Sequence, residues 1–110
     1  MLIASTEAIQ GQEIARTLGL VRGSAIRSRN VFQDFSEWVR NLVGSELQHY
    51  TKMMAEAREQ ALDRMIDQAR MLGADAVVGV RIATSSITRG AAELVAYGTA
   101  VTLTERPLDR

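Results

Sequence analysis

The sequence predicts an α+β fold in which a long helix packs on a small, mainly antiparallel sheet. Between residues 45 and 72 an apolar side chain recurs every three or four positions, a spacing typical of an amphipathic helix. This repeat stops at Gly73, and two alternating patterns typical of strands follow at residues 76–84 and 94–104. A chain of 110 residues suits one domain, which we assign to residues 1–110.

The first 29 residues predict strands and turns. Residues 2–5 can form a short strand, and residues 13–26 a longer one that Gly19 and Gly23 interrupt. Glycine within a strand marks a bulge, a bend or the close approach of another backbone segment. We therefore expect a bent or split strand.

Residues 30–43 predict a short helix. Asn30 suits its N-cap, Gln33 follows at the capping-box spacing, and Gly44 suits the left-handed C-cap position. Both phenylalanines and the only tryptophan lie in this segment. Another surface must cover so much aromatic area.

A second helix begins at Ser45 and is about 40 Å long at 1.5 Å per residue. Its apolar stripe is formed by Leu47, Tyr50, Met54, Ala57, Ala61, Met65, Ala69 and Leu72. Its opposite, polar stripe is formed by Lys52, Glu56, Glu59, Asp63, Asp67 and Arg70. The helix is longer than a small sheet can cover. Its length and the three small alanines of the apolar stripe suggest that part of it packs against another subunit.

The two alternating segments after Gly73 predict a β-hairpin with its turn at Arg89 and Gly90. In the first segment, alternation places one set of residues on one face: Ala76, Val78, Val80, Ile82 and Thr84. The intervening set faces the other way: Val77, Gly79, Arg81 and Ala83. We expect the helix to cover one sheet face and to leave exposed a face rich in glycine, alanine and valine. Such a face beside open strand edges predicts self-association.

Composition restricts the function. Thirteen basic residues balance thirteen acidic ones, which gives no support for binding nucleic acid or an anionic membrane. The absence of cysteine excludes disulfides, thiolate metal sites and thiol nucleophiles. No apolar run approaches the roughly 20 residues that span a bilayer, and the N-terminus lacks the pattern of a secretory signal. We expect a cytoplasmic protein.

The sequence offers five candidate ligand-binding residues and no catalytic, cofactor-binding or metal-binding set. Asn30 with Arg27 and Arg29 could hold a small anion at a helix N-terminus. His49, the only histidine, shares a helix face with Glu46 and could contribute to a metal site only between subunits. Asp34 completes the candidates, although a solvated helix face also explains its position.

The order of segments resembles the YbjQ-like family of small bacterial and archaeal proteins. The matching segments are residues 19–26 (GLVRGSAI), 30–34 (NVFQD), 57–59 (ARE) with Ala61, 69–80 (ARMLGADAVVGV) and 98–101 (GTAV). The resemblance implies a two-layer, dodecin-like subunit and a homo-oligomer, typically a pentamer. The family's heavy-metal-binding label implies a metal cofactor, but a chain with no cysteine and one histidine offers no residues onto which a soft-metal site maps.

Three hypotheses for the function follow. The first is a non-enzymatic oligomeric binding module that holds a small ligand or a metal ion at subunit interfaces. There, Arg27, Asn30, Asp34 or His49 would act together across copies. The second is a structural or adaptor oligomer that contacts another protein. The third is an enzyme with an active site between subunits.

Overall fold

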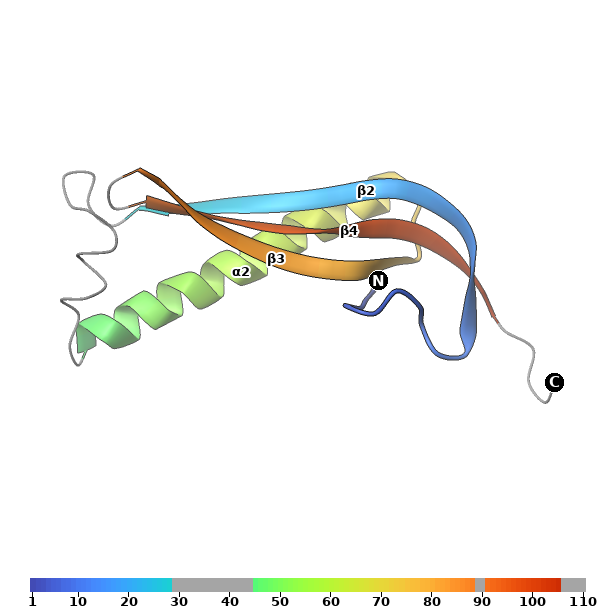
Figure 1. Cartoon of the computed structure of the whole chain (residues 1–110), viewed down its shortest axis with the longest axis horizontal. Coiled ribbons are helices and arrows are strands. Elements are labelled where there is room, and N and C mark those ends of the chain that lie inside the picture. Colours follow the sequence, from blue (N-terminus) through green and yellow to red (C-terminus); the bar gives the residue numbers. More distant parts are fainter. Residues whose placement is uncertain (29–44, 89–90, 106–110) are drawn as a thin grey trace.

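One helix packs on a mixed four-stranded sheet in the computed structural model, which describes residues 1–28, 45–88 and 91–105 (Figure 1). The elements are β1 (Leu2–Ile3), β2 (Gln12–Ser28), α2 (Ser45–Met71), β3 (Ala76–Thr88) and β4 (Ala91–Glu105). The strand order in the sheet is β1-β3-β4-β2. The predicted helix at residues 30–43 and the turn at residues 89–90 lie outside the described residues.

The predicted hairpin is confirmed, and β4 is a central strand. β3 pairs antiparallel with β4 as far as Thr88 and Ala91. On its other side, β4 pairs antiparallel with β2 from Gln12 opposite Glu105 to Ser28 opposite Ala91. The short strand β1 joins β3 in parallel, so the sheet is mainly but not wholly antiparallel.

The long helix ends as predicted. Gly73 has a positive φ of 81°, a conformation that glycine adopts without steric cost. Its N–H donates to Arg70 O, and the N–H of Ala74 donates to Ala69 O. These two bonds form a Schellman motif, which satisfies carbonyl groups of the last helical turn. The predicted polar stripe is exposed along its whole length.

The sheet face beneath the helix carries small side chains, contrary to our expectation that such a face would be the exposed one. Its buried residues include Val21, Gly23, Ala25, Ala96, Gly98 and Ala100. A Cβ atom at Gly23 would clash with the carbonyl oxygen of Ala61 and the amide nitrogen of Met65. Small residues are needed here because the helix backbone lies directly against the strand.

The alanines of the helix face their own sheet rather than another subunit. Ala57, Ala61 and Ala69 are fully buried within the chain, together with Met65. All four belong to the core between α2 and the sheet. These alanines therefore give no support to a contact with a neighbouring subunit, because close packing against β2 already buries them. That part of the helix packs against another subunit stays a prediction.

A bulge in β3 changes which of its side chains share a face. Val78 pairs with Thr99 and Arg81 pairs with Tyr97, so β3 contains one residue more than β4 over this stretch. Gly79 adopts a positive φ of 63° there. Val77 before the bulge and Val80 after it both pack on the helix side. The prediction of one uniform alternation over residues 76–84 was wrong, because the extra residue reverses it.

β2 is irregular near Gly19, as predicted. Its register against β4 shifts between Ile14 and Arg16 and again between Thr17 and Gly19. Gly19 has a φ of 128°, whereas Gly23 keeps its register opposite Ala96 and marks the close approach of the helix instead. The paired strands β2 and β4 bend at this end of the molecule, near the N-terminal segment (Figure 1). Local irregularity thus accompanies the curvature of the sheet.

Candidate functional site

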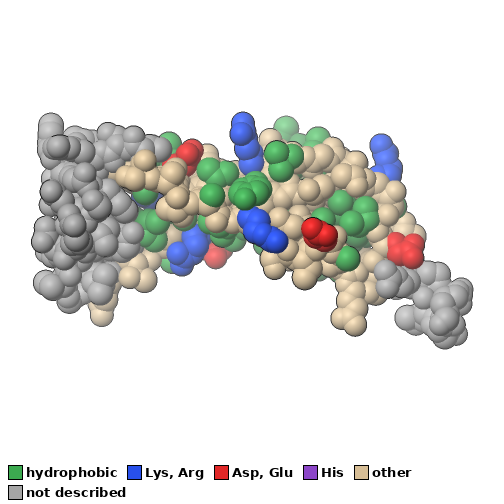
Figure 2. Space-filling view, viewed as in Figure 1, with side chains coloured by type: hydrophobic (Ala, Val, Ile, Leu, Met, Phe, Trp, Pro, Cys, Tyr) green, Lys and Arg blue, Asp and Glu red, His purple; other side chains and the backbone are tan. Residues whose placement is uncertain are grey.

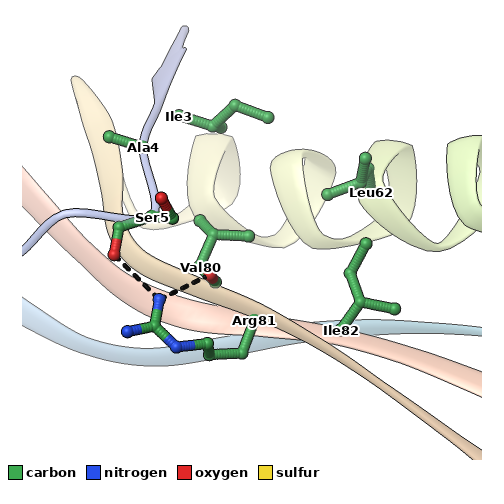
Figure 3. A pocket seen from close by; sticks show the side chains of 7 residues that line it. All are labelled: Ile3, Ala4, Ser5, Leu62, Val80, Arg81 and Ile82. Atoms are coloured by element: carbon green, nitrogen blue, oxygen red, sulfur yellow. Dashed lines mark hydrogen bonds between the residues drawn. The ribbon is translucent and has the colours of Figure 1, made fainter.

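An apolar hollow lies where the N-terminal segment, α2 and β3 meet (Figure 3). It measures about 410 Å³, and we call it the edge hollow. Its lining residues are Ile3, Ala4, Ser5, Leu62, Val80, Arg81 and Ile82. Ile3 and Ile82 are 40% and 41% exposed, although both are large and apolar. Apolar side chains left open to this extent around a hollow indicate a surface that another group can cover.

The N-terminal segment covers only the first part of the outer edge of β3. Ala4 donates its N–H to Val77 O at 3.0 Å, and Val80 donates its N–H to Ala4 O at 3.0 Å. The N–H of Gly79 donates to Thr6 O at 2.8 Å. Beyond Val80, no described residue pairs with the outer side of β3, and residues 81–86 are exposed. We call residues 82–86 of β3 the open edge.

Arg81 fastens the N-terminal segment to β3. Its Nη1 donates to Ser5 O at 2.8 Å and to Val80 O at 2.9 Å (Figure 3). Arg81 therefore borders the edge hollow, while its guanidinium is directed away from Leu62 and Ile82 (Figure 3). The lining residues include no carboxylate, imidazole or thiol. The hollow is suited to binding an apolar surface rather than to acid–base chemistry.

The outer edge of β2, at the other side of the sheet, is partly covered by helix side chains. The N–H of Arg22 donates to Gln68 Oε1 at 2.6 Å. Arg64 Nη1 donates to the carbonyl oxygen of Ser24. These side-chain contacts occupy backbone groups that an incoming strand would need.

Of the five predicted ligand-binding residues, the structure describes the surroundings of Arg27 alone. Its Nη2 donates to Gln60 Oε1 at 2.7 Å, and its Nη1 donates to Ile26 O. It borders a hollow of about 470 Å³ that is also lined by Glu56, Glu59 and Asp63. Carboxylates beside Arg27 oppose the binding of an anion there.

The other four candidates cannot be assembled into a site. Arg29, Asn30 and Asp34 lie outside the described residues. His49 belongs to α2, but its side chain is not described. The anion site at Asn30 stays a prediction. Sequence patterns missed the edge hollow, because its walls come from three segments far apart in the chain. The glycine at residue 79 was the one signal of an irregular strand nearby.

Apolar groups are also exposed away from the edge hollow. The face shown in Figure 2 presents hydrophobic side chains between single charged residues. Among the sheet residues whose side chains are described, the most exposed large apolar ones are Leu20 at 69% and Ile26 at 54%, both on β2. Among the described helices, none is long and apolar enough to cross a membrane.

Comparison with known proteins identifies the family. The YbjQ_1 family model, described as "putative heavy-metal-binding", matches residues 1–104. A crystal structure of a protein of unknown function of the DUF74 family, from Pediococcus pentosaceus, has a similar fold with a TM-score of 0.64. It is 16% identical, and the match covers 94% of this chain and 98% of that one. This structural similarity supports the fold alone.

The residues of this chain do not fit the heavy-metal description. The sequence contains no cysteine and one histidine, so the thiolate ligands that soft metals prefer are absent. Within residues 1–28, 45–88 and 91–105, no group of three or more His, Cys, Asp or Glu side chains could hold a metal ion. The buried Met65 is a core residue between helix and sheet.

Close relatives span nearly the whole chain. A "UPF0145 protein" from Halorubrum lacusprofundi is 54% identical over 103 residues, which is 94% of this chain and 99% of the relative. Another from Methanosarcina acetivorans is 50% identical over 106 residues, 96% of this chain and 100% of the relative. A third, from Thermus thermophilus, is 50% identical over 94% of this chain and 90% of the relative. The chain belongs to the YbjQ family, the group that includes these UPF0145 proteins.

Proposed function

We propose that this protein is a non-enzymatic binding module that works as a homo-oligomer of dodecin-like subunits. The observation that supports it is the open edge of β3, which lies beside the half-exposed apolar side chains of the edge hollow. An unpaired strand edge next to apolar surface is a ready site for another chain. A second copy of this chain is the occupant that we propose.

The position of the apolar surfaces favours a ring over a two-fold dimer. Ile3 and Ile82 lie at the β1–β3 side of the sheet, whereas Leu20 and Ile26 lie on β2 at the opposite side. Because Gln68 and Arg64 occupy backbone groups of the β2 edge, the contact on that side would be made by exposed β2 side chains. A contact that joins one side of a subunit to the other side of its neighbour leaves a free surface at each end. When copies are joined by such head-to-tail contacts, no surface is left free only if the copies form a closed ring. The family resemblance implies five copies.

A ring would also create binding sites that one chain lacks. Each side chain near a subunit boundary is repeated in every copy, so weak contacts from Arg27 or His49 could combine. We propose that a small ligand is held at such boundaries. Metal binding receives less support, since the described residues offer no cluster of metal ligands within one chain.

A proline at Thr84 tests the assembly. Val80 directs its N–H outward to Ala4 O, and alternate residues of a strand present their N–H groups at the same edge. Thr84 therefore presents its N–H at the open edge, away from β4. Thr84→Pro removes that donor and breaks no hydrogen bond to β4. Edge strands tolerate a proline at such a position. Native mass spectrometry should find an oligomer for the unmodified protein and smaller species for Thr84→Pro.

The matched control is Thr84→Val, which keeps the N–H and should assemble normally. Ala83→Pro, one residue earlier, removes a donor that faces β4 and should lower the thermal midpoint. A monomeric unmodified protein would contradict the proposal, and so would a Thr84→Pro variant that assembles fully. Elemental analysis of the purified oligomer tests for metal separately. A monomer that binds a different protein at β3 would favour the adaptor hypothesis instead.

A further inference from the structure

We propose that this protein binds a small zwitterionic molecule, of the class of free α-amino acids with an apolar side chain, on the sheet face opposite the helix. The site is a second hollow, of about 360 Å³, near the lower end of the roughly 300–1,000 Å³ typical of ligand pockets. We call it the bulge hollow. Its polar lining residues are Glu7, Thr17, Arg81 and Thr99. All of them come from one chain, so the inference goes beyond the proposed assembly.

Two bulges direct polar side chains into this hollow. In β3, regular alternation from Val77 would place Arg81 on the helix side, but the extra residue leaves Val80 there and turns Arg81 to the opposite face. In β2, Leu18 packs on the helix side, and the register shift before Gly19 leaves Thr17 on the opposite face. Without the bulges, both polar residues would point toward the helix. Bulges redirect side chains in this way and are frequent beside binding and active sites.

Thr99 lies between these two residues on the central strand. It pairs with Val78 on one side and with Leu20 on the other, and its side chain lines the same hollow. The three neighbouring strands therefore each contribute one polar side chain. The hydroxyls of Thr17 and Thr99 can both donate and accept hydrogen bonds.

Arg81 is held in place and keeps donors free for a ligand. Its Nη1 is occupied by the carbonyl oxygens of Ser5 and Val80, which restricts the side chain. Its Nε and Nη2 make no described hydrogen bond, and the described ion pair joins other residues, Arg70 and Asp67. A guanidinium presents these two N–H directions in the geometry of a carboxylate. The ligand carboxylate is therefore assigned to Arg81.

The carboxylate and the apolar lining of the bulge hollow determine which groups the ligand carries besides its carboxylate. Glu7 supplies a carboxylate on the same lining, which suits a ligand ammonium group. One positive and one negative residue favour a zwitterion over a simple anion. The apolar part of the lining consists of Ile14, Val78 and Val101, of which Val78 and Val101 are buried. This floor suits a short apolar side chain.

Calorimetric titration with three matched molecules tests the assignment. Valine carries both charged groups, isovalerate lacks the ammonium and isobutylamine lacks the carboxylate. We expect valine to bind most tightly, and each analogue to lose about tenfold or more, as removal of a charge-assisted hydrogen bond does. Glu7→Gln should weaken valine but leave isovalerate unchanged. Arg81→Gln should weaken both.

Further variants separate binding from folding. Arg81 also holds Ser5, so Thr99→Val, which keeps side-chain shape, provides a second test if Arg81→Gln unfolds. Thr99→Val should weaken valine binding with an unchanged thermal midpoint. Arg58→Gln and Glu59→Gln, exposed charges on the helix, are the matched controls and should bind normally.

The inference is overturned if valine and the other common apolar L-amino acids fail to bind the unmodified protein. It is equally overturned if binding is insensitive to Glu7→Gln and Thr99→Val. Native mass spectrometry of the same samples separates this outcome from the assembly. A monomer that binds valine would support the bulge hollow and contradict the ring. An oligomer that binds none of these molecules would support the ring and contradict the ligand site in the bulge hollow.

Discussion

The two outer edges of the sheet differ in what covers them. On β2, Gln68 and Arg64 of the helix occupy the N–H of Arg22 and the carbonyl of Ser24. On β3, the N-terminal segment stops at Val80, and the open edge continues without a described partner. Elements elsewhere in the chain therefore decide which edge of the sheet is available to a partner.

The difference follows from where the helix lies. Gly23 and Ala25 of β2, with Ala96 and Ala100 of β4, form a surface of small residues on which the helix packs closely. Its long polar side chains then reach the edge of β2. β3 presents larger side chains, Val80 and Ile82, beside Leu62 of the helix. The hollow and the open edge both lie on that side.

The largest effect is expected from Ala61→Glu, which would remove the difference between the edges by displacing the helix. Ala61 is fully buried against the sheet, and the described core around it contains no charged side chain. An unpaired buried charge should lower the free energy of unfolding by at least about 3 kcal/mol. Chemical denaturation followed by circular dichroism measures it. Arg58→Glu, on the exposed side of the helix, should have little effect, and equal losses would contradict the packing.

A smaller effect is expected from Gly23→Ala, which lifts the helix without adding a charge. The added methyl group would clash with the backbone of Ala61 and Met65. Overpacking of this kind should cost about 1–3 kcal/mol. Ser24→Ala is the control, because its side chain is not on the helix side. Equal stability of Gly23→Ala and the unmodified protein would show that the helix can move away freely.

The smallest effect is expected from Gln68→Leu, which uncovers the edge of β2 alone. It removes the acceptor of the Arg22 N–H, and an exposed hydrogen bond of this type contributes about 0.5–1 kcal/mol. The Arg22 amide should exchange its hydrogen faster, at a rate closer to that of the Thr84 amide at the open edge. Gln48→Leu is the same replacement at an exposed position near the start of the helix and should leave Arg22 unchanged. Unchanged exchange in Gln68→Leu would mean that the helix side chain does not protect this edge.

The sequence predicted the elements well where side-chain periodicity is long and regular. The helix, its end at Gly73 and the hairpin all follow from spacing over ten or more residues. The bulge at Gly79 did not, because one additional residue reverses the alternation without changing composition. The buried sheet face was misassigned for a related reason. Small residues are compatible with an exposed face and also with a close helix, and only the clash at Gly23 distinguishes them.

The candidate sites were less predictable than the fold. The edge hollow needs Ile3, Leu62 and Ile82, which meet only after the N-terminal segment is placed against β3. The bulge hollow depends on two register shifts, neither of which has a unique sequence pattern. The ligand-binding candidates proposed from the sequence were charged or polar residues near the predicted helix starts. The structure instead places Arg27 against Gln60 and beside helix carboxylates.

The pairing of β2 with β4 also governs when the chain can fold. Gln12 lies opposite Glu105, so β2 pairs along its whole length with β4, a strand that is synthesised long after it. Until residues 91–105 have left the ribosome, β2 lacks the strand with which it pairs, and the helix lacks the part of its packing surface that β4 supplies. Contacts so distant in sequence form slowly. The sheet is thus expected to form only once β4 has been synthesised, with an exposed β2 as the segment most in need of protection in the interval.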